Sequence, residues 1–365
     1  MNSKNLSLLE SIVKNPSSPW MDGSGELSDV VISSRVRLAR NLRNVPFPHL
    51  LEEGQAREVL ARIADAVKDL VSKSAKTPFG DLHVFDLQEV SPLDRQVLVE
   101  KHLMSPQHAQ SGYGKGLVTR SDEKVSIMVN EEDHVRLQCL YSGLELEEAW
   151  IAASGIDDLL DERLDFAYDD RIGFLTACPT NVGTGLRASV MVHLPALAMG
   201  DEVTRVLSSV NKLGLVVRGL FGEGTEGQGN VFQISNQVTL GQTEKEIIEN
   251  LSLVAKQVVA EEKKFRETLL RNQRTALEDR IFRAWGILSN ARSMSSQEAV
   301  KLWSDVRLGV ELSMMPGLDV RRVNQILVMA QPSFVQRTTG KALPPEERDV
   351  RRADLIRQHL SPSRA

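Results

Sequence analysis

The stretch DVVISSRVRLAR, residues 29–40, joins branched apolar residues typical of a β-strand to a run of arginines. Successive side chains of a strand point to opposite faces, so Arg35 and Arg37 should lie side by side on one face. Adjacent guanidinium groups repel unless an anion lies between them, and their planar donor sets match phosphate oxygens. The segment predicts either an anion-binding strand or a solvated basic edge that discourages strand pairing.

Further strand-like segments follow this stretch, and one helical segment lies between them. The apolar spacing of three and four over residues 52–72 predicts an amphipathic helix. Strands are predicted at VSIMVN (125–130) and RASVMVHLPAL (187–197), and a hairpin with a glycine-rich connection at 211–237. The first part of the chain therefore predicts a mixed α/β domain, to which we assign residues 1–250.

After Thr243 the sequence becomes helical throughout. Residues 244–288 form one long helical pattern without proline, rich in Glu, Lys, Arg and Leu. Further helices are expected at 295–315, 320–330 and 345–360. We assign residues 251–365 to an all-helical C-terminal domain, with the long helix as its connection to the first.

The composition of the 365 residues is that of an ordinary soluble globular protein, with 41% hydrophobic and 25% charged residues. It excludes a chain disordered throughout, a collagen-like fibre and a disulfide scaffold. The net charge of −5 shows no basic excess for nucleic acid or an anionic membrane. Two cysteines, a polar N-terminus and the absence of an apolar run near ~18 residues predict a cytoplasmic protein in a reducing compartment.

A second polar cluster, VNEEDHVRLQ (129–138), follows the strand at 125–130 and contains Glu131, Glu132 and Arg136. Three successive acids repel one another, so burying them requires nearby cations. The cluster is interpreted either as a site at the end of a buried strand or as an ordinary surface turn.

A third segment, ACPTNVGTGLRASV (177–190), holds Cys178 and Arg187 around a turn of glycines and small hydroxyl residues. Such a turn allows backbone N–H groups to approach an anion closely, and a thiol beside cations gains thiolate character. The alternative is a buried, inert cysteine, which is also our interpretation of Cys139.

The glycine-rich segment RGLFGEGTEGQGN (218–230) contains Arg218 and Glu223. It is consistent with a lid over a bound substrate or with a plain mobile hairpin. The sequence has no GxxxxGK[ST] loop, no protein-kinase motif set and no HExxH or paired CxxC zinc motif. A phosphotransferase built on this chain would have to use arginines in place of a P-loop lysine.

Four segments in this order, SSRVRLAR, NEEDHVR, CPTNVGTGLRASV and the RG…GEGTEG loop, resemble the catalytic domain of the phosphagen (guanidino) kinases over residues 25–250. The resemblance implies an antiparallel sheet flanked by helices, with ATP and Mg²⁺ as the nucleotide substrate. It implies that Glu132 and Glu223 hold an acceptor guanidinium beside Cys178. It also implies an arginine cage for the ATP phosphates, with His102 as a nucleotide contact or else a surface histidine; the cage is Arg35, Arg37, Arg136, Arg187 and Arg218.

The C-terminal half is similar to that of the bacterial protein arginine kinases, which phosphorylate arginine side chains of proteins. The arginine motif begins at Ser33, which leaves no room for the helical domain that precedes it in small-molecule members. The family's phosphoarginine-binding motif matches RDVRRA, which assigns that second, allosteric site to Arg348, Asp349, Arg352 and Ala353. On a helix Arg348 and Arg352 face the same side. The alternative is a solvated, charge-balanced helix.

The resemblance implies a protein arginine kinase that marks proteins for Clp protease degradation and inactivates a heat-shock repressor. The implied partners are proteins with accessible arginines, a zinc-binding activator, the heat-shock repressor and the Clp unfoldase, without direct nucleic acid or membrane binding. A homodimer is expected through apolar residues that look exposed within 302–330. The alternatives are a kinase for free arginine or another small guanidino compound, and a non-catalytic phosphoarginine-binding adaptor.

Overall fold

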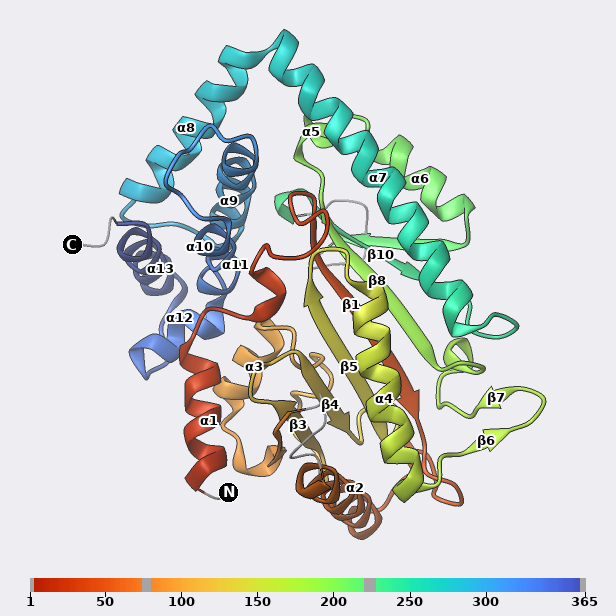
Figure 1. The fold of residues 1–365 in the computed structure, drawn as a ribbon. Helices are drawn as coiled ribbons and strands as arrows, with labels where there is room; N and C mark the ends of the chain where they lie inside the picture. Colours follow the sequence, from red (N-terminus) through yellow and green to blue (C-terminus); the bar gives the residue numbers. More distant parts are fainter. Residues whose placement is uncertain (1–2, 74–79, 220–227, 362–365) are drawn as a thin grey trace.

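The computed structural model describes residues 3–73, 80–219 and 228–361 and is built around an antiparallel eight-stranded sheet (Figure 1). The strand order is β2-β3-β4-β5-β1-β8-β10-β9, so β1 lies in the middle. A small hairpin, β6 (Tyr168–Asp169) and β7 (Gly173–Phe174), lies apart from the sheet. The strands of the large sheet are β1 (Val31–Arg40), β2 (Leu82–Asp86), β3 (Gly116–Arg120), β4 (Val125–Val129), β5 (Val135–Ser142), β8 (Leu186–His193), β9 (Leu215–Gly219) and β10 (Val231–Asn236).

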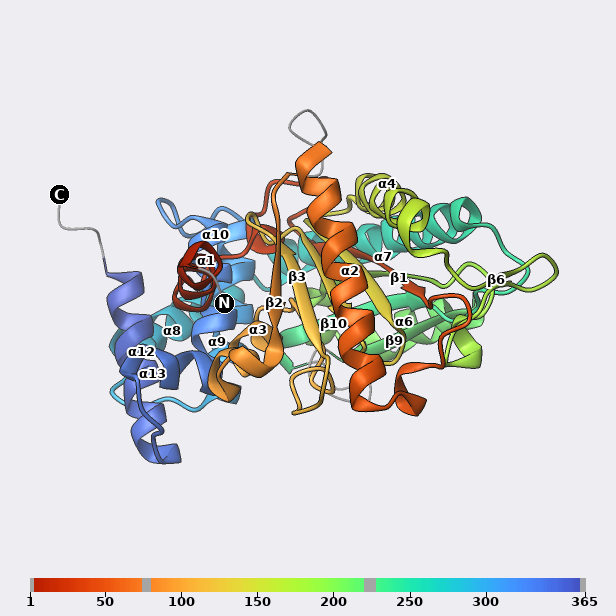
Figure 2. The same ribbon diagram turned by 90° about the horizontal axis from the view of Figure 1, so that it is seen from below.

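Helices cover one face of the sheet, and further helices form a separate body beside it (Figures 1 and 2). Apolar residues of α2, α4 and α7 form one core with the strands. The helices are α1 (Ser3–Lys14), α2 (Glu53–Lys73), α3 (Pro92–Glu100), α4 (Leu146–Leu164), α5 (Pro195–Met199), α6 (Val203–Lys212), α7 (Glu244–Asn272), α8 (Arg274–Asn290), α9 (Ser296–Glu311), α10 (Val320–Asn324), α11 (Ile326–Met329), α12 (Pro332–Thr339) and α13 (Pro345–Leu360).

The alternation of β1 decides which face of the sheet is polar. Val36 and Leu38 are fully buried in the core beneath the helices, whereas Arg35 and Arg37 are only half-buried. Since alternate side chains of a strand point to opposite faces, both arginines lie on the face away from that core. The prediction that they share a face is confirmed, and the solvated basic edge is excluded because β1 is a central strand.

The predicted single helix over 244–288 is wrong, because the helix breaks at Gln273. This residue leaves the helical region (φ −138°, ψ 28°) and separates α7 from α8. The two helices meet in an inverted V (Figure 1), which brings α8 back against α9. A straight continuation would leave Leu277, Ile281 and the other buried apolar residues of α8 in solvent, so burial accounts for the turn.

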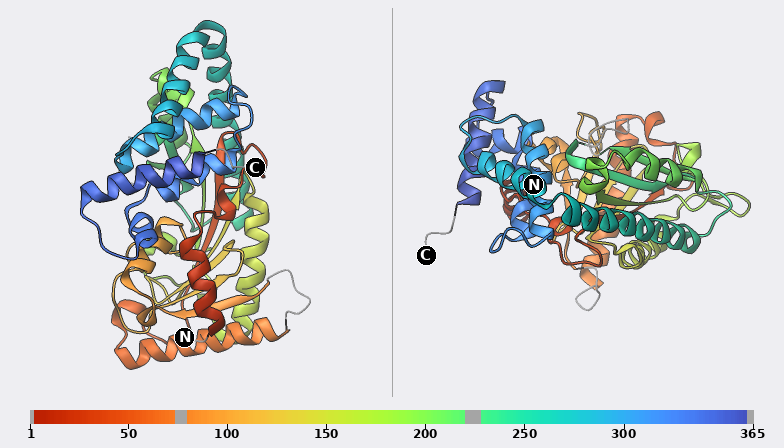
Figure 3. Two further views of the ribbon diagram at one scale, coloured as in Figure 1. Left: turned by 90° about the vertical axis from the view of Figure 1, so that its left-hand side faces the viewer. Right: turned by 90° about the horizontal axis from the view of Figure 1, so that it is seen from above.

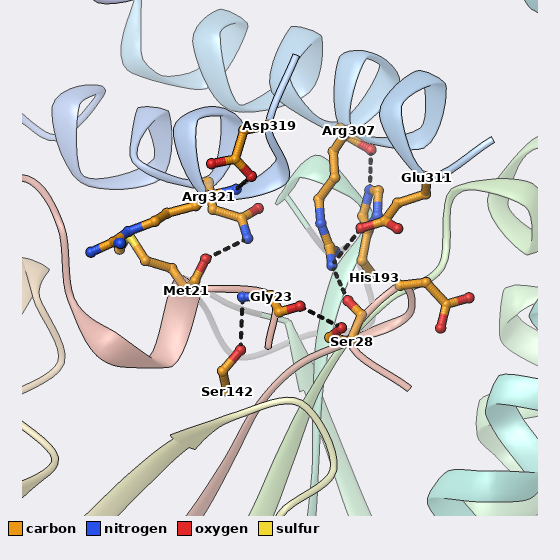
Figure 4. A network of polar contacts seen from close by, with 12 residues as sticks. Met21, Gly23, Ser28, Ser142, His193, Arg307, Glu311, Asp319 and Arg321 are labelled. Carbon is orange, nitrogen blue, oxygen red and sulfur yellow. Dashed lines mark hydrogen bonds and ion pairs between the residues drawn. The ribbon is translucent and has the colours of Figure 1, made fainter. Parts of the chain in front are cut away.

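The helical body is joined to the sheet by buried polar contacts (Figure 4). The fully buried Arg307 of α9 donates a hydrogen bond to the Ser28 carbonyl, 2.8 Å away, just before β1. His193, at the end of β8, lies 2.8 Å from the Ser304 hydroxyl of α9. The Gly23 N–H donates to the Ser142 hydroxyl at the end of β5. The body therefore contacts the end of β8 and the segment that leads into β1, and Gly23 of that segment contacts the end of β5.

The expectation that apolar residues within 302–330 are exposed is also wrong. Trp303, Leu308 and Met315 are buried, and the neighbouring Leu302, Val310, Leu312 and Met314 pack against the same core. This core also includes buried residues of α1, of α3 and of the sheet. Figure 3 shows the helical body beside the sheet from two further sides. No helix among the described residues is long and apolar enough to span a membrane.

Candidate active site

Five arginines from four strands gather on the open face of the sheet. Arg37 of β1 lies directly opposite Arg187 of β8, and Arg136 of β5 lies opposite Ala39. Arg218, on β9, is exposed beside β10. Antiparallel pairing therefore brings together arginines that lie far apart in the sequence, as the predicted cage requires.

The pKa values show that these cations influence one another. Burial lowers the pKa of Arg35 to about 10, with further lowering by Arg136 and Arg187. Burial lowers the pKa of Arg187 as well, and Arg218 and Arg136 add to the effect. The Nε of Arg37 is buried and has no hydrogen-bond partner among the residues that the structure describes. Repelling cations with an unused donor form a site that a polyanion would stabilise.

His102 lies at one end of this cluster, next to Arg35. Both residues line a small cavity with Trp20 and Gln233, and the His102 ring packs edge-on against Trp20 at 5.1 Å. Burial lowers the pKa of His102 to about 4, with a contribution from Arg35, so the ring is neutral at pH 7. Gln233 accepts a 2.9 Å hydrogen bond from Arg35. His102 is thus not a surface histidine.

The acids that follow β4 form the opposite wall of the site. Glu131 pairs with Arg136 and accepts a 2.6 Å hydrogen bond from Ser105. Glu132 lies 3.9 Å from Arg136, and 44% of its side chain is exposed. Burial, reinforced by Asp133 and Glu131, raises the pKa of Glu132. Glu132 is therefore the accessible carboxylate of the cluster and has the raised pKa that favours proton acceptance.

Asp133 connects the acidic turn to the segment that carries Cys178. One of its carboxylate oxygens accepts hydrogen bonds from the Ala177 N–H at 2.7 Å and from the Asn41 amide at 2.6 Å. Cys178 is half-buried with its sulfur 3.0 Å from the Thr180 hydroxyl, and it is one of the residues that influence the pKa of Arg187. Cys178 is thus held beside the cage rather than buried in the core.

The other sequence-predicted residues divide into two groups. Glu223 lies outside the described residues. Cys139 is fully buried and burial raises its pKa to about 12, which confirms an inert thiol. Sequence reasoning missed Gln233, the partner of Arg35, and the anchoring role of Asp133. No local pattern marks either one, because their partners come from distant segments.

The RDVRRA segment lies on α13, where its three arginines have different environments. Arg352 is buried and donates hydrogen bonds to the carbonyls of Ala330 (2.7 Å) and Met294 (2.8 Å). It also forms an ion pair with Asp349. Arg348 is half-buried and makes no side-chain hydrogen bond or ion pair with the described residues. Arg352 therefore holds α13 in place, whereas Arg348 and Arg351 are cations without a side-chain partner among the described residues.

An antiparallel sheet with a cationic face and an adjoining acidic wall is what the resemblance to the guanidino kinases implied. The family model for the ATP:guanido phosphotransferase C-terminal catalytic domain matches residues 62–265. A crystal structure of lombricine kinase is similar with a TM-score of 0.56 and 26% identity, covering 66% of this chain and 68% of that one. The duplicated taurocyamine kinase from Schistosoma mansoni shares the fold, with a TM-score of 0.59 and 23% identity. The match covers 80% of this chain and 42% of that one.

The remainder of the chain defines the family more narrowly. The model described as the protein-arginine kinase McsB C-terminal domain matches residues 274–365. A protein-arginine kinase from Moorella thermoacetica is 53% identical, with 94% of this chain and 97% of the relative covered. One from Symbiobacterium thermophilum is 51% identical, with 96% and 98% covered. The chain belongs to the protein-arginine kinase family of ATP:guanido phosphotransferases.

Proposed function

We propose that this protein transfers the γ-phosphate of ATP to arginine side chains of proteins. One observation carries the proposal: a five-arginine cluster suited to a triphosphate adjoins an accessible carboxylate, Glu132, suited to a guanidinium. The similarity to protein-arginine kinases over nearly the whole chain supports the acceptor class.

In the proposed mechanism the arginine cage and His102 hold the nucleotide while acids hold the acceptor. A free guanidinium is protonated and has no lone pair to attack with. Glu132, together with Glu223, would aim a terminal nitrogen at the γ-phosphorus and accept its proton. The N–P bond forms as the bond from the γ-phosphorus to the bridging oxygen breaks, and ADP leaves. Catalysis is then mainly positioning and charge stabilisation, without a covalent enzyme intermediate.

The arginines stabilise the negative charge that spreads over the transferred phosphoryl group. Arg37 and Arg187 lie opposite each other at the centre, and the unpaired Nε of Arg37 gives one donor ready for a phosphate oxygen. Among the described residues no three His, Cys, Asp or Glu side chains converge as metal ligands. Mg²⁺ would enter as the substrate complex ATP·Mg²⁺, because phosphate oxygens are ligands that Mg²⁺ prefers.

The alternative acceptors are distinguished by one assay. The protein would be incubated with ATP·Mg²⁺ and either free arginine, casein or a basic protein, and the acid-lability of the phosphorylated product would then be measured. We expect phosphoarginine on the protein substrate and little on free arginine. Efficient use of free arginine would indicate the small-molecule kinase, and no phosphoarginine on any substrate would indicate the non-catalytic adaptor.

A second proposal concerns α13 as an allosteric phosphoarginine site. Arg348 would bind the phosphoryl group, and Asp349 would bind the cationic remainder of the ligand. Ala353, which is buried, leaves room for close packing. Arg352 would contribute while remaining tied to the Ala330 and Met294 carbonyls. Calorimetry with phosphoarginine on Arg348→Gln tests this site, since unchanged affinity would exclude it.

The cellular role is proposed from the family. The protein would act in the cytoplasm and mark substrates for the Clp unfoldase and protease. It would also inactivate a heat-shock repressor, with a zinc-binding protein as its activator. We also propose a homodimer. The exposed Phe282 and Ile287 of α8 supply apolar surface on the helical body for that contact. Sedimentation of Phe282→Asp against the unmodified protein tests the dimer.

A further inference from the structure

Two adjoining surface cavities extend away from the acids of the active site. The first has a volume of 640 Å³ and is lined by Glu131, Glu132 and Ala177 among others. The second has a volume of 490 Å³ and is lined by Arg95 of α3. Both cavities are also lined by Gly112 and by Tyr113, whose surface is 59% exposed. The two cavities meet at Gly112 and Tyr113, so we treat them as one surface, which we call the Tyr113 groove.

The wall of the Tyr113 groove is held in place before any ligand binds. The buried Asn130 amide donates to the carbonyls of Ala56 (2.9 Å) and Gly114 (2.7 Å), which ties the acidic turn to α2 and to the loop carrying Tyr113. The Lys115 ammonium donates to the carbonyls of Gln107 and Gln110, both at 3.2 Å. A preformed groove loses less conformational freedom on binding than a mobile one.

The two ends of the Tyr113 groove carry opposite charges. Glu131 and Glu132 lie at the acceptor end. At the other end Arg95 makes no side-chain hydrogen bond or ion pair with the described residues, and its Nε is buried without a partner. Lys115 lies between the two ends and is influenced by both. Burial lowers the pKa of its ammonium, the Glu131 carboxylate acts to raise that pKa, and the Arg95 guanidinium acts to lower it.

An arginine whose buried donor has no partner destabilises the protein, because that donor has lost its hydrogen bonds to water. A carboxylate is the ligand that satisfies a guanidinium best, since two parallel hydrogen bonds accompany the charge attraction. An occupant with a cation at one end and a carboxylate at the other would match both ends of the groove. A polypeptide with an acidic residue near its target arginine has this pattern.

We propose that the Tyr113 groove binds the substrate chain on one side of the target arginine, with an Asp or Glu of the substrate on Arg95. Arg95 would then be a specificity-determining residue that does not touch the reacting atoms. This inference rests on the proposed function. Free arginine has no flanking chain, so the groove would contribute nothing to its binding.

The test uses peptides that contain one arginine. In each peptide a single Asp occupies one of the four positions before or after the arginine. The same peptide with Asn at that position is the neutral control. We expect the unmodified full-length protein to prefer Asp over Asn at one or two positions on one side, by about five- to twentyfold in kcat/KM. In Arg95→Gln this preference should disappear while kcat/KM for the Asn peptides stays within about twofold.

Two further variants complete the test. Arg95→Glu should reverse the preference toward Lys at the same positions. Arg205→Gln removes an arginine of α6, near the opposite edge of the sheet, and should keep the Asp preference. Equal use of Asp and Asn peptides, or a preference that persists in Arg95→Gln, would overturn the groove proposal. The proposed function would stand in that case, because the peptides are still phosphorylated on arginine. Absence of phosphoarginine on every peptide and protein would overturn the proposed function as well.

Discussion

Replacing Arg352 by alanine should destabilise the protein strongly, although this residue belongs to the proposed ligand-binding motif. Its buried guanidinium donates to the carbonyls of Ala330 and Met294, which lie in two other segments of the helical body. Hydrogen bonds from a charged donor contribute about 1.5–3 kcal/mol each, so the two together contribute about 3–6 kcal/mol.

The ion pair with Asp349 adds little to this figure. The Asp349 side chain is 34% exposed, and partly exposed pairs contribute about 1 kcal/mol or less. Partial rehydration of the two carbonyls would reduce the loss, so we expect Arg352→Ala to lower the free energy of unfolding by about 3–5 kcal/mol. Arg348→Ala removes no such contact and should change it by less than about 0.5 kcal/mol.

Urea unfolding followed by tryptophan fluorescence measures the effect, because Trp285 and Trp303 lie in the helical body. With a slope of about 1–3 kcal/mol per molar urea, the midpoint of Arg352→Ala should fall by about 1 M or more. Arg352→Lys keeps the charge but loses the planar set of donors. Its urea midpoint should lie between those of Arg352→Ala and the unmodified protein. A midpoint for Arg352→Ala within about 0.2 M of the unmodified protein would refute the structural role. If Arg352→Ala is destabilised as expected, loss of ligand binding in Arg348→Gln is the clearer evidence for the α13 site, because Arg348 does not hold the helical body together.

Three other predictions concern the active site. Glu132→Gln should keep its melting temperature, because the side chain is largely exposed, but lose about 100-fold or more in kcat; near-normal turnover would remove Glu132 from proton transfer. Burial raises the pKa of Glu132, and the ionised carboxylate is the active form. The value of kcat/KM should therefore fall as the pH is lowered through that raised pKa. A pH profile that does not change in this region would contradict the role of Glu132. In the native protein a thiol reagent should modify Cys178 rapidly and Cys139 only on unfolding, because Cys139 is buried. Equal modification rates in the two single-cysteine variants would contradict this difference in burial.

The sequence by itself determined the chemistry and the local geometry of the cage. The alternation in SSRVRLAR is enough to place Arg35 and Arg37 on one face, because the period of a strand is a local property. The motif residues also indicated which arginines belong together, and the strand register brings them to the same face of the sheet.

The tertiary structure decided which partners these residues have. Gln233 meets Arg35 across 198 positions of sequence, and Ala177 meets Asp133 through its backbone N–H. The break at Gln273 and the burial of Trp303 arise because α8 and α9 cover each other, although the local helical pattern continues through residue 288. Hydrogen-bond partners and burial depend on segments that meet only when the chain is folded, so no spacing along the sequence could specify them.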